Sequence, residues 1–188
     1  TSNGLFIDGP GNETALIFYP GGKVEYTAYL PLMNDIASCG IDCYLIEMPF
    51  NIAFLGANSA DEIINNTNYS RYVIAGHSLG GIAASSYAHE HNISGLILLA
   101  SYPTEEIKVP VLSIYGSNDG VLKLNDYNNA KSFYKANFTE IIINGGNHAQ
   151  FGNYGNQSGD GIANITSENQ RNQTVTAILN FIFNLKIY

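Results

Sequence analysis

Short apolar segments that alternate with amphipathic ones are the feature of this chain that most constrains its fold. Residues 15–19, 42–47 and 95–100 are apolar along nearly their whole length, rather than at every second position. Strands with this pattern are typical of a sheet that is buried on both faces. The segments between them space their apolar residues as a helix does, for example within residues 25–38. The pattern therefore predicts an α/β fold, with a doubly wound, mostly parallel sheet and helices on both faces.

The remaining elements follow from the same patterns. The expected strands are residues 15–19, 42–47, 72–75, 95–100, 109–115 and 140–143. The expected helices are residues 25–38, 60–65, a helix of small residues that Ser78 opens, 125–135 and 168–183. Neither a composition break nor a linker divides the sequence, so we expect one domain over residues 1–188. The loop before the strand at 109–115 is too short to hold a cap domain.

An excess of acidic residues narrows the classes of partner. Sixteen Asp and Glu stand against eight Lys and Arg, which gives a formal net charge of −8. Such a protein repels phosphate backbones and anionic lipid headgroups, so we expect neither nucleic-acid binding nor peripheral membrane binding. No apolar run reaches the roughly 18 residues that a membrane span needs. The sequence does not indicate an oligomeric state.

Neither the cysteines nor the acidic residues form a recognisable metal site. Cys39 and Cys43 lie four residues apart around Gly40, which is too few ligands for zinc and an awkward spacing for a disulfide. We expect two free, buried thiols that flank a turn. Asp160 lies between two glycines and fits a turn better than a metal site, because no second group of ligands accompanies it. We therefore expect no metal and no cofactor.

A serine stands in the most distinctive local motif of the chain. Residues 76–80 read GHSLG, a G-x-S-x-G pattern between an apolar strand and a helix of small residues. A serine at such a sharp turn adopts strained backbone angles, and the flanking glycines avoid collisions between side chains. The pentapeptide alone arises by chance, and Ser78 could serve only as a helix N-cap. Its place at a strand–turn–helix junction instead indicates a nucleophile.

Two polar loops follow later strands and offer an acid and a base. Asp119 follows the strand at 109–115, and His148 follows the strand at 140–143. The carboxyl ends of parallel strands meet at one edge of a sheet, where reactants gather. We therefore expect Ser78, Asp119 and His148 to lie close together there.

Other acidic and histidine residues compete for these roles. Asp126 is a rival acid. His77 neighbours the nucleophile, but we expect its side chain to point away from the reaction centre. His89 and His91 end the helix after Ser78, where a histidine suits the helix dipole.

Four strings of residues together carry a resemblance to a known family. They are YPGGKVE at 19–25, EMPFN at 47–51, GHSLGG at 76–81 and GNHAQFG at 146–152. With these strings and its serine–acid–histidine order, the chain resembles small, lidless α/β-hydrolases related to dienelactone hydrolases and carboxylesterases, and bacterial members in particular. Members often carry an N-terminal membrane anchor. Because the sequence starts with Thr1, we expect a removed anchor or signal and an extracytoplasmic location, with a cytoplasmic one as the alternative.

The resemblance implies acyl transfer by a serine hydrolase that uses no cofactor. Ser78 would attack an ester-type carbonyl, His148 would take its proton, and Asp119 would hold the imidazole. The backbone N–H of Leu79 would supply one donor of the oxyanion hole. The other donor would be the N–H of either Gly22 or Lys23, because the usual His-Gly of the superfamily is Pro-Gly in this loop.

Aromatic residues near these strand ends are candidates for a shallow acyl pocket. They are Tyr26, Tyr29, Phe50, Phe54, Phe151 and Tyr154, and packing within core and loops is their alternative role. A shallow pocket favours small esters, uncharged or weakly polar, as the partner molecules. A thioesterase, amidase, peptidase or acyltransferase with the same triad is one alternative function. A non-catalytic binding module on a hydrolase scaffold is another, which the intact triad disfavours.

Overall fold

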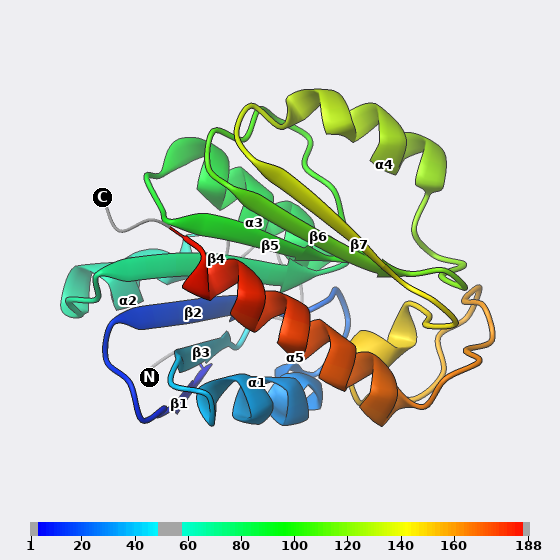
Figure 1. The fold of residues 1–188 in the computed structure, drawn as a ribbon, viewed down its shortest axis with the longest axis horizontal. Helices are drawn as coiled ribbons and strands as arrows, with labels where there is room; N and C mark the ends of the chain where they lie inside the picture. Colours follow the sequence, from blue (N-terminus) through cyan, green and yellow to red (C-terminus); the bar gives the residue numbers. More distant parts are fainter. Residues whose placement is uncertain (1–3, 49–57, 186–188) are drawn as a thin grey trace.

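A mostly parallel sheet of seven strands organises the chain. The computed structural model describes residues 4–48 and 58–185. The strands are β1 (Gly4–Ile7), β2 (Thr14–Tyr19), β3 (Asp42–Ile46), β4 (Arg71–His77), β5 (Gly95–Leu99), β6 (Val111–Gly116) and β7 (Phe138–Ile143). They lie in the order β1-β3-β2-β4-β5-β6-β7, and among them only β1 runs antiparallel to its neighbour (Figure 1).

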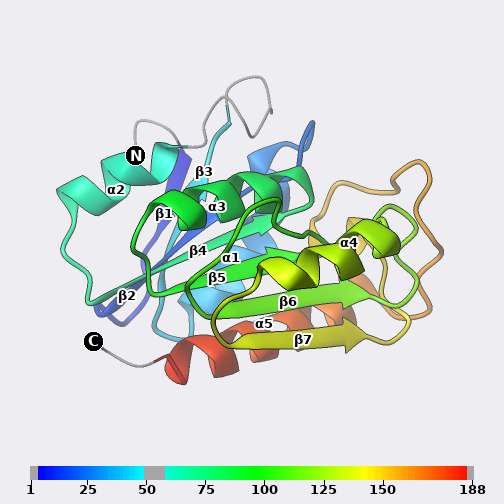
Figure 2. The same ribbon diagram turned by 90° about the horizontal axis from the view of Figure 1, so that it is seen from above.

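Helices cover both faces of this sheet, as its apolar strands require. One face carries α1 (Leu30–Ala37) and α5 (Ser167–Phe183), and the other carries α2 (Ser59–Asn66), α3 (Leu79–Glu90) and α4 (Leu124–Ala130) (Figure 2). Two hydrophobic cores result. Neighbouring residues Ile17 and Phe18 of β2 point into opposite cores, because alternate side chains of a strand face opposite sides. The predicted doubly wound α/β fold is confirmed.

Two of the expected helices are shorter than predicted and adjoin 3₁₀ turns. A 3₁₀ turn at Tyr26–Tyr29 precedes α1, where the sequence predicted one helix over 25–38. Pro31 gives the reason, since a residue without an N–H is tolerated in the first turn of an α-helix but not in its interior. Similarly, α4 ends at Ala130 and a 3₁₀ turn follows at Lys131–Phe133, within the predicted helix 125–135.

Strand β1 is the element that the sequence pattern did not predict. It has four residues at the edge of the sheet, and its Leu5 and Phe6 are 36% and 43% exposed. Backbone pairing with β3, rather than burial of side chains, defines it. Its residues are apolar, but a run of only four does not by pattern alone distinguish a strand from other structure.

The two cysteines are free thiols, as predicted, but only one of them is buried. Cys43 lies within β3, and its thiol contacts the carbonyl oxygen of Ile41 at 3.5 Å. Cys39 is exposed in the turn after α1. Its predicted burial was wrong, because the turn that reverses the chain between α1 and β3 lies at the surface.

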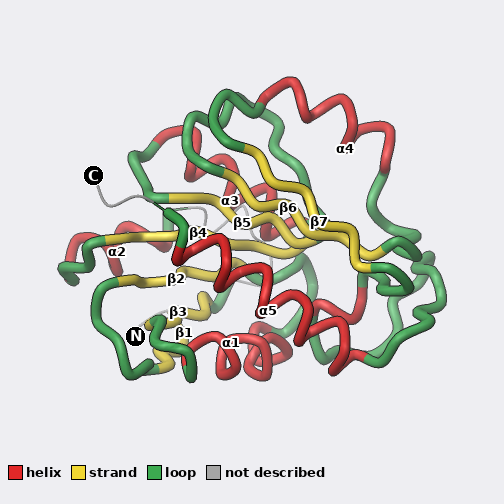
Figure 3. Tube along the Cα trace, in the orientation of Figure 1, coloured by secondary structure: helices red, strands yellow, loops and turns green. Residues whose placement is uncertain are grey.

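Loops after β4, β6 and β7 form the edge at which the candidate side chains Ser78, Asp119 and His148 lie. β4, β6 and β7 are parallel members of one sheet, so their carboxyl ends point the same way. The connection from β7 to α5 is mostly loop, interrupted by a short 3₁₀ turn at Ala149–Phe151 (Figure 3). This edge of the sheet therefore brings together residues that are far apart in the sequence.

Candidate active site

Ser78 stands at a strained turn between β4 and α3. Its backbone angles are φ 54° and ψ −123°, in a region that residues with a side chain rarely adopt. The turn is held from both sides, since Ser78 N donates to Leu99 O at 2.9 Å and Ser101 Oγ donates to Ser78 O at 2.7 Å. The Ser78 side chain makes no capping hydrogen bond to α3. The hydroxyl therefore has no helix-capping role, which was the alternative reading of this serine.

Glycines on either side of Ser78 allow α3 to lie very close to the sheet. A Cβ atom on Gly76 would collide with the backbone of Gly80 and come within 2.7 Å of Gly81 N. A Cβ on Gly80 would meet the backbone of Tyr19 and Pro20 at the end of β2. Only glycine fits at both positions. The G-x-S-x-G spacing thus has a steric cause in the packing of three elements.

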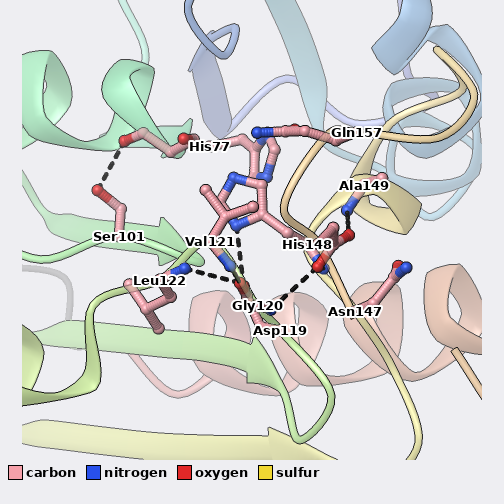
Figure 4. A network of polar contacts seen from close by, with 12 residues as sticks. His77, Ser101, Asp119, Gly120, Val121, Leu122, Asn147, His148, Ala149 and Gln157 are labelled. Carbon is pink, nitrogen blue, oxygen red and sulfur yellow. Dashed lines mark hydrogen bonds and ion pairs between the residues drawn. The ribbon is translucent and has the colours of Figure 1, made fainter. Parts of the chain in front are cut away.

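Asp119 and His148 form a buried pair. His148 Nδ1 lies 2.9 Å from Asp119 Oδ2, and the two side chains are 2% and 1% exposed (Figure 4). The other carboxylate oxygen, Asp119 Oδ1, accepts from Val121 N at 2.9 Å and from Leu122 N at 2.8 Å. These bonds fix the carboxylate in one orientation. The rival acid, Asp126, lies exposed in the first turn of α4.

The pairing leaves one nitrogen of His148 available. A proton on Nδ1 satisfies the carboxylate, which assigns Nε2 as the acceptor. Nε2 is buried and has no hydrogen-bond partner among the described residues. A buried polar atom without a partner is uncommon and calls for an explanation. A role of Nε2 as a proton acceptor would explain why it has no partner.

His77 lies beside His148, contrary to the expectation that its side chain points away. The two ring centroids are 4.6 Å apart. His77 shares a face of β4 with Val73 and Ala75, because alternate residues of a strand point the same way, and α1 and α5 cover that face. The alternation of the strand, rather than the sharp turn after it, sets the direction of this side chain.

A tyrosine connects His77 to the loop after β2. Tyr29 Oη lies 2.8 Å from His77 Nδ1 and accepts from Gly21 N at 3.0 Å. Burial, and then the electrostatic effect of neighbouring His148, lowers the pKa of His77 well below its ordinary value of 6.5. Burial also raises the pKa of Tyr29. The His77 imidazole and the Tyr29 hydroxyl are therefore both neutral. They form a buried hydrogen-bonded pair next to His148.

The loop after β2 lies against the start of α3. A Cβ atom on Gly22 would come within 2.6 Å of Leu79 Cδ1, so the loop and Leu79 are in close contact. The N–H of Leu79 belongs to the first residue of α3 and has no partner within the helix. Lys23 adopts a positive φ of 62°. Gly21 N is already bonded to Tyr29, which leaves Gly22 and Lys23 as the candidate donors of this loop.

The aromatic residues proposed for an acyl pocket have different surroundings. Phe151 is 3% exposed and its ring packs on His77 at a centroid distance of 5.6 Å, so it belongs to the core under the site. Tyr154 is half-buried, and its hydroxyl donates to Gln157 Oε1 at 2.9 Å. Tyr26 is partly buried against the same core. Phe50 and Phe54 lie outside the described residues.

An open hollow borders the loop after β2. It measures about 440 Å³ and is lined by residues of that loop and by Asn153 and Tyr154. Tyr154 is thus the aromatic candidate that combines contact with His77, at a centroid distance of 6.3 Å, with exposure to this hollow. Burial, with the nearby charges of Asp160 and Asp119, raises the pKa of Tyr154, so its hydroxyl is neutral.

Tyr29, which was expected either to line the pocket or to pack in the core, is fully buried and contacts His77. Asp160 had no predicted part in the site and was expected only as a turn residue. Asp160 instead accepts hydrogen bonds from the loops of Asp119 and His148. No local pattern indicates such a contact, because it joins segments about 40 residues apart in the sequence.

A mostly parallel sheet with a strained serine turn and polar loops at its carboxyl edge is the architecture of hydrolases of the α/β class. The chain matches the model of the alpha/beta hydrolase family over residues 15–172 and belongs to that family. No curated protein matches it in sequence. The strings that carried the resemblance thus led to the correct family.

Solved structures agree on the fold. The mouse alpha/beta hydrolase domain-containing protein 10 is similar with a TM-score of 0.72 and 11% sequence identity, over 97% of this chain and 94% of that one. A His-tagged serine hydrolase involved in carbazole degradation, the CarC enzyme, is similar with a TM-score of 0.67 and 11% identity, over 93% and 94% of the two chains. At this identity the likeness concerns the fold alone.

Residues 4–48 and 58–185 hold neither a candidate metal site nor a candidate membrane span. No group of three or more His, Cys, Asp or Glu side chains in that part of the chain is placed to hold a metal ion. None of its helices combines the length and apolar character that crossing a membrane requires.

Proposed function

We propose that this α/β hydrolase is a serine hydrolase that cleaves small ester-type substrates through an acyl-enzyme. Ser78 is the nucleophile, His148 the base and Asp119 the residue that orients the base. One observation carries the proposal: the buried Asp119–His148 pair leaves Nε2 without a partner at the sheet edge where Ser78 lies. A histidine held in this tautomer is suited to accept a proton from a serine hydroxyl.

Acylation begins when Ser78 Oγ attacks the ester carbonyl carbon while His148 Nε2 takes the hydroxyl proton. The carbonyl oxygen becomes an oxyanion, which the N–H of Leu79 and that of Gly22 or Lys23 would stabilise. The contact between Gly22 and Leu79 supports this role, because it places the two backbone segments next to each other. The imidazolium then gives its proton to the departing alkoxide, which leaves as the alcohol.

Deacylation repeats the same steps with water. His148 Nε2 takes a proton from a water molecule, whose oxygen attacks the acyl carbon. The second tetrahedral intermediate collapses, the carboxylic acid leaves, and Ser78 Oγ regains its proton from His148. Asp119 stays ionised throughout and stabilises the imidazolium in both halves of the reaction.

A labelling experiment tests the nucleophile. The purified protein reacts with a fluorophosphonate probe, and we expect the wild type to be labelled and Ser78→Ala to lose both label and esterase activity. A drop in kcat of several orders of magnitude is expected, as for other triads that lose their nucleophile. Ser86→Ala is the matched control, because Ser86 lies on the same helix and bonds only weakly, at 3.5 Å, to Glu105.

Two outcomes would contradict the assignment. Label that persists on Ser78→Ala would show that another residue reacts. A wild-type protein that binds substrate esters but is neither labelled nor active would favour a binding module. A panel of esters, thioesters and amides then identifies the preferred leaving group, which the triad alone does not determine.

A further inference from the structure

The carboxylate of Asp160 joins the loop of Asp119 to the loop of His148. Asp160 Oδ1 accepts from Gly120 N at 3.1 Å, from His148 N at 3.2 Å and from Gly161 N at 2.8 Å. Oδ2 accepts from Ala149 N at 2.8 Å. Of these four donors, one directly follows Asp119, one is the backbone of His148 itself, and one directly follows it.

Close packing keeps the Asp160 segment in place against the Asp119 loop. A Cβ atom on Gly120 would come within 2.8 Å of Gly161 N and 3.0 Å of the Asp160 backbone. A Cβ on Gly161 would collide with the carbonyl oxygen of Asn118. Gly120 and Gly161 are therefore needed for the approach of the two segments, beyond any role in forming a turn.

Two side-chain amides add to the same junction. Asn118 Nδ2 donates to Ile162 O at 2.8 Å, and Asn147 Nδ2 donates to Gly161 O at 2.8 Å. Asn118 directly precedes Asp119, and Asn147 directly precedes His148. The segment around Asp160 thus contacts both loops on both sides of the paired residues.

From this junction we propose that Asp160 is a positioning residue for the Asp119–His148 pair. Its carboxylate sets the distance between two loops that leave different strands, and so holds His148 Nδ1 within hydrogen-bond distance of Asp119 Oδ2. Hydrogen bonds from backbone N–H groups to an ionised carboxylate are stronger than those to a neutral acceptor. The activity readout of this inference rests on the proposed function. The hydrogen-bond geometry at Asp160 is independent of that function.

Two substitutions at Asp160 separate the effect of the carboxylate charge from the effect of the side-chain volume. Asp160→Asn keeps the shape but offers one carbonyl oxygen in place of two charged oxygens, and Asp160→Ala removes all four bonds. We expect kcat to fall about tenfold for Asn and about a hundredfold for Ala, with KM changed by less than about threefold, because misplaced catalytic groups slow the chemical step. Asp126→Asn is the matched control, with an exposed carboxylate on α4, and should keep kcat.

A second readout needs no activity. The Nδ1–H proton of His148, which donates to Asp119, should give a sharp downfield resonance in the NMR spectrum of the wild type and of Asp126→Asn. We expect this resonance to broaden or shift in Asp160→Asn, while the melting temperature shows that the variant is folded. The measurement also works on a protein that turns out not to cleave esters.

The outcomes distinguish this inference from the proposed function. If Asp160→Asn and Asp160→Ala are folded and keep both kcat and the wild-type resonance, Asp160 has only a structural role and the inference is wrong. If the wild type shows no labelling or hydrolysis but the resonance still depends on Asp160, the proposed function fails and the positioning role stands. A fall in kcat in the Asp160 variants without a change in KM, together with the altered resonance, supports both the proposed function and the positioning role.

Discussion

His77 lies with its ring between His148, Tyr29 and Phe151, almost completely shielded from solvent. Burial keeps it neutral in the folded protein, since its pKa lies well below the ordinary 6.5. In the unfolded chain the same imidazole binds a proton as the pH falls through 6.5. Below pH 6.5, His77 is neutral in the folded state and charged in the unfolded state, so a falling pH favours unfolding.

Acid should therefore destabilise the protein through His77. We expect a level free energy of unfolding above about pH 7 and a loss of up to about 1.4 kcal/mol per pH unit below the ordinary pKa of histidine. In His77→Asn, which retains an acceptor for Tyr29, the loss between about pH 7.5 and 5.5 should shrink by about 1 kcal/mol. Urea unfolding at both pH values measures this. His89→Asn, at an exposed position on α3, should behave as the wild type, and an unchanged loss in His77→Asn would show that another group titrates.

Helix α3 depends on glycine at its contact with β2. Gly80→Ala places a methyl group against the carbonyls of Tyr19 and Pro20, so the helix must move away from the sheet. We expect the free energy of unfolding to fall by about 1–3 kcal/mol, as for other overpacked sites. The N–H of Leu79 moves with the helix, so kcat should fall about a hundredfold, as when one oxyanion donor is lost.

A second glycine provides the control for this element. Gly40 has a φ of 97° in the turn after α1, and a Cβ atom there would meet its nearest neighbour, Gly11 N, without a clash at 4.0 Å. Gly40→Ala should cost about 1 kcal/mol or more from backbone strain alone and leave kcat unchanged. Urea unfolding and ester hydrolysis measure both variants. Equal effects of the two substitutions on kcat would contradict a specific role of the close helix contact.

At the scale of the whole molecule, the described residues offer little cover for a long acyl chain. Within residues 58–185, the loop between the end of β5 at Leu99 and the start of β6 at Val111 is too short to hold a cap domain. Phe151 is buried in the core, and the hollow beside the loop after β2 is open to solvent. A long acyl chain would therefore stay largely in water.

Activity on p-nitrophenyl esters should peak between acetyl and hexanoyl. Each methylene that a pocket buries contributes about 0.8 kcal/mol, or about fourfold in kcat/KM, and that gain stops where the pocket ends. Measurement of kcat/KM across a series from acetyl to dodecanoyl tests the expectation. A profile that rises through dodecanoyl, or activation on emulsions, would indicate a lipase.

The sequence by itself determined the elements and the order of the chemical groups. Continuous apolar strands require burial on both faces, which is a local property that the chain displays directly. The G-x-S-x-G pattern likewise predicts a sharp strand-to-helix turn at Ser78. The expected order of strands and helices holds apart from β1 and the short 3₁₀ turns. The sequence also favoured Asp119 over Asp126, and the structure places Asp119 beside His148; their catalytic roles stay a prediction.

Only the tertiary structure decided how these groups meet. The direction of His77, the bond from Tyr29 to Gly21, the burial of Phe151 and the junction at Asp160 all depend on contacts between segments that are distant in the sequence. Such contacts form when loops close over a packed sheet, and many sequences of polar loop residues are compatible with the same local pattern. Hydrophobic periodicity encodes which side of an element is buried. It carries no information about which distant polar group lies opposite a given loop. Chemistry at this edge depends on the distances between such groups, which only the packed loops determine.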